Sequence, residues 1–182
     1  MARRRGESTF LSELKRSHQA VNPGCLWHKI ADTPVYDNGK DSERKMRFTL
    51  PKPCDVMTGV PGMAIAIEGK YHNGTSPWPL GSVSKNQHAN LAAAINSGYE
   101  SFVALRYRLS GAFDLVRLIY YPMVNSLIDQ GLKSLPMMFV KHELYEVPKI
   151  KILDNLYWKL DIETFRQAIN HGTSTRQENL FN

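Results

Sequence analysis

Cysteine is scarce in this chain, and its histidines follow no metal-binding pattern. Cys25 and Cys54 are the only two cysteines among 182 residues. They are too few for a disulfide scaffold and form no CxxC motif. The six histidines show no spacing typical of a zinc site. We therefore expect two reduced thiols, and we expect any bound metal to have oxygen ligands.

The chain also lacks a long apolar segment. No run of about eighteen apolar residues occurs, so the sequence predicts no membrane-spanning helix. The basic start of the chain, Met-Ala-Arg-Arg-Arg-Gly-Glu, is followed by no apolar segment of the kind that a secretory signal requires. We expect a cytoplasmic protein with no membrane partner.

Positive charge exceeds negative charge. The chain has 23 Lys and Arg against 17 Asp and Glu, which gives a formal net charge of +6. This excess favours a polyanionic partner such as DNA, although ribosomal and membrane-surface proteins have similar compositions. The length and the hydrophobic fraction of 42% suit one domain better than two independent cores.

The hydrophobic pattern predicts a mixed α/β fold. A first helix fits residues 8–21, with Ser8 or Thr9 as its cap, and a second fits 84–97, with Gly98 as its stop. Strand patterns occur at 25–31, 47–50, 54–57, 63–71 and 101–109. We therefore expect a mixed central β-sheet flanked by helices.

Beyond Gly111 the pattern is less regular. Residues 113–131 resemble one helix broken or kinked at Pro122. Further predictions are a strand at 157–161, a last helix at 162–170 and a frayed end at 171–182. We expect a single domain over residues 1–182, with its core at about 7–110 and 155–171, and with an insertion or a dimerisation element at 111–154.

The strand at 63–71 ends in an ion pair. Side chains alternate along a strand, so Glu68 and Lys70 share one face with two alanines. Burying charge is costly unless the charge is paired or bound to metal. A turn at residues 58–62 can fold Asp55 back beside Glu68, which would place two carboxylates within reach of one cation. Such spacing also arises by chance in many proteins.

Two carboxylates of this kind suit Mg²⁺, which prefers oxygen ligands. Lys70 could then stabilise charge that develops on a phosphate. Gln87 has two interpretations: it completes a capping box with Ser84, or it projects toward the metal site. A third carboxylate could come from the first helix, as Glu13 or alternatively as Glu7.

Several basic residues are candidates for phosphate contacts in DNA binding. Each of them alone could equally be an ordinary surface charge. They are Arg3, Arg4, Arg5, Lys15, Arg16 and Lys85.

Taken together, these residues resemble the PD-(D/E)XK nucleases, and in particular the RecU-type Holliday junction resolvases. Asp55 and Glu68-Gly69-Lys70 match the motif of that superfamily. Further similarity lies at residues 27–35, 78–87 and 98–108, so the resemblance covers roughly residues 7–108. It departs from the family at Pro53, where the family has a threonine, and at 36–45, which is short for the segment that enters a junction.

The resemblance implies a restriction-endonuclease-like core and Mg²⁺-dependent cleavage, with Mn²⁺ as an alternative ion. Asp55 and Glu68 would be metal ligands, Lys70 the transition-state stabiliser, and Gln87 a support of the metal site. It also implies a homodimer that cuts four-way DNA junctions by paired symmetric hydrolysis, in DNA recombination and repair. The expected location is the cytoplasm of a bacterium or of a phage-infected host cell.

Two other functions are compatible with the same residues. One is a restriction- or repair-type nuclease that acts on duplex DNA. The other is a DNA-binding scaffold that keeps the fold without activity, although the intact set of Asp55, Glu68 and Lys70 argues against it.

Overall fold

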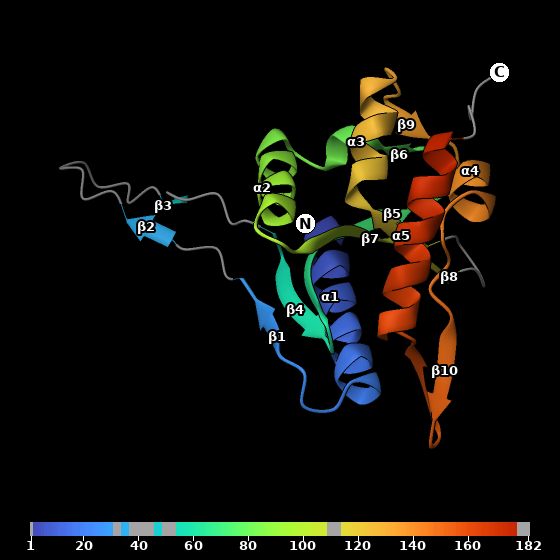
Figure 1. The fold of residues 1–182 in the computed structure, drawn as a ribbon. Coiled ribbons are helices and arrows are strands. Elements are labelled where there is room, and N and C mark those ends of the chain that lie inside the picture. Colours follow the sequence, from blue (N-terminus) through green and yellow to red (C-terminus); the bar gives the residue numbers. More distant parts are fainter. Residues whose placement is uncertain (1, 31–33, 37–45, 49–53, 109–113, 178–182) are drawn as a thin grey trace.

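Five strands form a mixed sheet at the centre of the computed structural model, which describes residues 2–30, 34–36, 46–48, 54–108 and 114–177 (Figure 1). Their order across the sheet is β1-β4-β5-β7-β8. β5 and β7 are parallel, and the other neighbours are antiparallel. The strands are β1 (Trp27–Lys29), β4 (Val56–Val60), β5 (Met63–Asn73), β7 (Glu100–Arg108) and β8 (Asp114–Tyr120).

Helices cover both faces of this sheet. On one face, α1 (Ala2–Val21) and α5 (Ile162–Gln177) bury Phe10, Leu14 and Phe165 against Ile67 and Phe102. On the other face lie α2 (Lys85–Asn96) and α3 (Tyr121–Asp129), which pack against a second apolar cluster. The predicted fold class, a mixed central sheet flanked by helices, is confirmed. No helix within the described ranges is long and apolar enough to cross a membrane.

Short elements complete the fold. β6 (Trp78–Pro79) pairs with β9 (Ser134–Leu135), β2 (Pro34–Tyr36) with β3 (Met46–Phe48), and β10 (Lys149–Ile152) with β11 (Asn155–Trp158). A single 3₁₀ turn, η1 (Leu80–Ser82), precedes α2, and α4 (Met137–His142) follows β9. In Figure 1, β10 extends to one end of the molecule, away from α2 and α3.

The turn between β4 and β5 is shorter than the predicted one. β4 continues through Gly59 to Val60, which pairs with Met63, so only Pro61 and Gly62 turn the chain. Gly62 has a φ of +81°, and a proline followed by such a residue fits a type II turn. The strand patterns predicted at 47–50 and 54–57 belong to two different sheets, because β3 pairs with β2 and only β4 joins the central sheet.

The prediction of one helix over residues 113–131 was wrong. The first half of that segment is β8, whose Val116 and Leu118 face α1 and α5. α3 then starts at Tyr121, with Pro122 in its first turn. Proline is tolerated there because the first N–H groups of a helix have no intrahelical partner. Pro122 therefore begins a helix and does not break one, and part of the predicted insertion at 111–154 contributes a strand to the central sheet.

The end of the chain also differs from its prediction. α5 continues to Gln177, whereas we expected residues from His171 onward to be frayed. Gly172 packs against the side chain of Tyr120, so this part of the helix has a tertiary contact that no local sequence signal reports.

Candidate functional site

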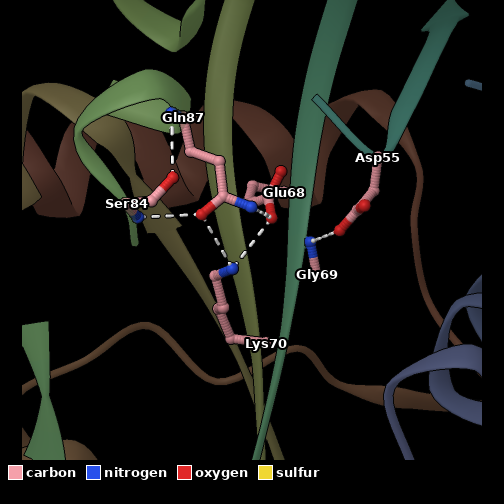
Figure 2. Close-up of polar contacts among 6 residues, drawn as sticks. All are labelled: Asp55, Glu68, Gly69, Lys70, Ser84 and Gln87. Carbon is pink, nitrogen blue, oxygen red and sulfur yellow. Dashed lines mark hydrogen bonds and ion pairs between the residues drawn. The ribbon is translucent and has the colours of Figure 1, made fainter. Parts of the chain in front are cut away.

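The site lies where β4 begins beside β5. Val56 and Ile67 are the last pair of the β4–β5 ladder, so Asp55 and Glu68 are the next residues along the same register. Beyond this point β5 continues to Asn73 with β7 as its neighbour. The Gly69 N–H therefore takes a side-chain acceptor: it donates to Asp55 Oδ2 at 2.9 Å (Figure 2).

Glu68, Lys70 and Gln87 form a hydrogen-bonded group next to Gly69. Lys70 Nζ donates to Glu68 Oε1 at 2.8 Å and to Gln87 Oε1 at 3.1 Å. The Gln87 side-chain amide also donates to Glu68 Oε1. Figure 2 shows these three side chains on one side of β5 and Asp55 on the other, with Gly69 between them. The Glu68-Gly69-Lys70 segment thus joins the Asp55–Gly69 hydrogen bond to the bonded group of Glu68, Lys70 and Gln87.

Burial makes this group unusual for charged residues. Relative exposure is 1% for Glu68, 5% for Lys70 and 6% for Asp55. Charged side chains are rarely so buried without partners. Two carboxylates and one ammonium carry a net charge of −1 here, the sign that a bound cation requires.

Gln87 completes the predicted capping box, and its side chain also reaches the charged residues of β5. It is the third residue of α2, where its N–H donates to Ser84 Oγ at 3.3 Å and its Oε1 accepts from Ser84 N at 2.8 Å. This is a capping box, as its spacing predicted. The same side chain reaches Glu68 and Lys70, so the helix cap aims the amide at β5.

Gly69 matters for packing as well as for its N–H. A Cβ at this position would lie 2.6 Å from Leu11 Cδ2 on α1 and 3.5 Å from Asp55 Oδ2. The first distance is too short for any side chain unless the Leu11 side chain or the helix shifts. The sequence signal for this role of Gly69 is its place inside a strand, where a glycine often marks a close approach.

Glu13 lies apart from the two carboxylates. Its Oε2 accepts from Arg106 Nη1 at 2.7 Å, and Arg106 also pairs with Asp114. Gly6 lies against Tyr71 and Leu11 against Gly69. Glu7, between them on α1, is thus on the part of the helix that crosses this end of β5. In the described part of the chain, no three His, Cys, Asp or Glu side chains converge as metal ligands.

The candidate phosphate-binding residues are spread over two helices. Lys15 and Arg16 are exposed on α1, and Lys85 is exposed at the start of α2. The side chains of Arg3, Arg4 and Arg5 lie outside the described residues, as do Pro53 and the segment 37–45.

Two neighbours of the site have shifted pKa values. Burial raises the pKa of the Cys54 thiol to about 11. This thiol therefore stays protonated at neutral pH and is unsuited to be a thiolate ligand or nucleophile. Burial lowers the pKa of His88, and the positive charge of Lys70 lowers it further.

Comparison with known proteins gives a weak likeness among solved structures. No protein-family model matches the chain, and no curated protein does. Among solved structures, the chain is similar to Hjc of Archaeoglobus fulgidus, a Holliday junction resolvase from an archaeal hyperthermophile. The two share 18% sequence identity with a TM-score of 0.39, and the match covers 92% of this chain and 98% of that one.

Proposed function

We propose that this chain is a metal-dependent endodeoxyribonuclease that resolves four-way DNA junctions, of the RecU type and encoded by a bacterium or a bacteriophage. The observation that carries the proposal is the position of Asp55 at the backbone of the Glu68-Gly69-Lys70 segment, with Lys70 bonded to Glu68 and Gln87. Two buried acids and one lysine, at the start of β4 and on β5, are a poor choice for stability alone.

The carboxylate ligands of this site are of the type that Mg²⁺ and Mn²⁺ bind. Asp55 and Glu68 supply oxygen donors, which both ions accept, and Mg²⁺ is usually held by only one or two carboxylates. Glu7 lies one helical turn before Leu11, which lies against Gly69, whereas Glu13 is engaged with Arg106. A bound ion would act as a Lewis acid toward a phosphate oxygen.

Among the described residues, Lys70 uses two of its three N–H donors, which leaves one for a substrate. An ammonium group has three N–H donors, and two of them reach Glu68 and Gln87. The third can bond a phosphate oxygen and stabilise the charge that grows there during hydrolysis. Gln87 holds the ammonium in place, because its own position is set by the start of α2.

The test of the reaction is cleavage of a labelled synthetic four-way junction with and without Mg²⁺, beside a duplex of the same arm sequence. A resolvase produces nicked duplexes from the junction only when Mg²⁺ is present. Equal cutting of the duplex would replace the resolvase by a general duplex nuclease. Junction binding without any cutting would indicate the inactive scaffold.

The test of the site uses the isosteric variants Asp55→Asn and Glu68→Gln, which retain hydrogen-bond acceptors for Gly69 and Lys70. We expect each to lower the cleavage rate by about 10²-fold or more, as loss of one electrostatic stabiliser usually does. We also expect weaker Mn²⁺ binding in calorimetry. Asp129→Asn, on exposed helix surface, is the matched control and should cleave as the wild type does. A wild-type rate in either site variant would disprove this site.

A further inference from the structure

The β10–β11 hairpin has a chemistry that the central site does not explain. Its residues 149–159 contain three lysines against one aspartate. Leu153 and Leu156 are 87% and 63% exposed, among the most exposed large apolar side chains of the described residues. The hairpin is therefore basic along its strands and apolar at its tip.

The tip is held in an unusual backbone conformation. Ile152 pairs with Asn155, so Leu153 and Asp154 alone turn the chain. Leu153 has a φ of +53°, a value that residues other than glycine seldom adopt. Strained positions of this kind gather at ligand-binding and functional sites. Here the strain presents a leucine side chain to solvent at the most distant point of the hairpin.

The base of the hairpin is fixed to α1. Trp158 N donates to Ser17 Oγ at 3.1 Å, and Lys149 Nζ lies 4.7 Å from the centre of the Trp158 ring. A cavity of about 260 Å³ lies between the two elements, lined by Glu13, Arg16, Ser17 and residues 155–158. Lys15 and Arg16 on α1 and Lys149 and Lys151 on β10 are all exposed. Positive charge therefore continues from the helix onto the hairpin.

We propose that the β10–β11 hairpin, together with Lys15 and Arg16, binds a duplex arm of the DNA substrate. The lysines contact backbone phosphates, and Leu153 lies against sugars and base edges in a groove, as apolar side chains of groove-binding proteins do. This inference rests on the proposed function for the identity of the substrate, and the charge of the surface selects a polyanion as its partner.

The spacing between the hairpin and the central site suits one duplex. Leu11 contacts Gly69, and Ser17 is six residues further along α1, which is about 9 Å of helix. β10 and β11 have four residues each, so the hairpin adds at most about 13 Å to this distance. Both distances together are shorter than one turn of DNA, which is about 34 Å. A duplex that lies along α1 from the cut site can therefore reach the hairpin.

The test measures binding without cleavage. Fluorescence anisotropy of a labelled four-way junction in buffer without divalent metal gives the affinity over roughly 50 to 200 mM salt. We expect Lys149→Glu/Lys151→Glu to weaken binding by about tenfold or more at low salt and to reduce the salt slope by about two. Lys151→Glu alone, which leaves Lys149 on Trp158, should give about half of that change in slope. Lys133→Glu, at exposed surface beside β9, has the same charge change as Lys151→Glu alone and is its control, which should bind as the wild type does.

The tip is tested by Leu153→Asn, since asparagine tolerates positive φ and removes only the apolar group. We expect weaker junction binding with an unchanged salt slope. Unaltered affinity in the lysine variants would overturn the proposal. A change in the oligomeric state of Leu153→Asn would also overturn it, because it would assign the tip to a second copy of the chain. Equal binding of the protein to anionic vesicles would overturn it as well.

The outcome is separate from that of the proposed function. If the chain binds junctions through the hairpin but never cuts them, the hairpin proposal stands and the proposed nuclease activity is disproved. Cleavage by a lysine variant with wild-type affinity would do the reverse. Circular dichroism of each variant shows that the central sheet is still folded.

Discussion

At the scale of single residues, the amide of Gln87 connects the start of α2 to the charged segment of β5. Its Oε1 accepts from both Ser84 N and Lys70 Nζ, while its Nε2 donates to Glu68. An amide can do this because it has one acceptor oxygen with two lone pairs and two N–H donors. Loss of the side chain therefore removes a helix cap and a support of Lys70 together.

The variants Gln87→Ala and Ser84→Ala separate these two effects. Ser84→Ala removes the capping hydroxyl, which should cost about 1 kcal/mol of unfolding free energy and leave cleavage close to the wild-type rate. Gln87→Ala should cost a similar amount of stability and also lower the cleavage rate by about 10- to 100-fold, as for other supports of a metal site. Denaturant unfolding and junction cleavage are the two measurements. If Ser84→Ala loses as much activity as Gln87→Ala, Gln87 acts only through the cap.

At the scale of elements, the second half of α1 is joined to β4 through a buried histidine. His18 is fully buried on α1, with Nε2 at 3.3 Å from Thr58 Oγ1 on β4 and its ring 5.3 Å from that of Trp27 on β1. Burial lowers its pKa, because the charged imidazolium would lose hydration there. α1 is also the helix that carries Leu11 to Gly69, so this contact supports the position of the helix over the site.

The lowered pKa predicts a dependence of stability on pH. In the unfolded chain His18 binds a proton near its ordinary pKa of 6.5, whereas in the folded chain it stays neutral to lower pH. Below about pH 6.5 the unfolded state then holds more protons, so stability falls as pH falls, by at most about 1.4 kcal/mol per pH unit from this group. His18→Gln should remove this part of the slope in urea unfolding from about pH 5 to 8. Equal slopes in the two proteins would contradict the assignment.

Elements also show where local patterns mislead. Residues 114–120 are largely apolar, which is also typical of a buried helix. They form β8 because they pair with the edge of β7 and their two faces pack against the two apolar clusters of the sheet. Propensity is a weak guide when tertiary contacts decide. By contrast, the N-cap Ser84 and the stop at Gly98, with its φ of +86°, act within one turn of helix and were correctly predicted.

At the scale of the whole molecule, one chain offers one site, and its sheet carries that site between two layers of helices. Symmetric cutting of two strands in a junction needs two such sites. We therefore propose a homodimer as the active form. Light scattering of the purified junction complex should give two protomers for each junction. A strict monomer on DNA would contradict paired cleavage, even if single cuts were still made.

Local patterns in the sequence are sufficient to find the candidate site residues and the elements that carry them. Glu68 and Lys70 share a face of β5 because side chains alternate along a strand, and Gln87 stands at the start of α2 because of its spacing from Ser84. Which distant groups meet depends on tertiary packing. Asp55 reaches the backbone of Gly69, and Glu13 pairs with Arg106, 93 residues away. Such contacts depend on how the sheet pairs and how α1 packs on it, and neither has a signal within a few neighbouring residues.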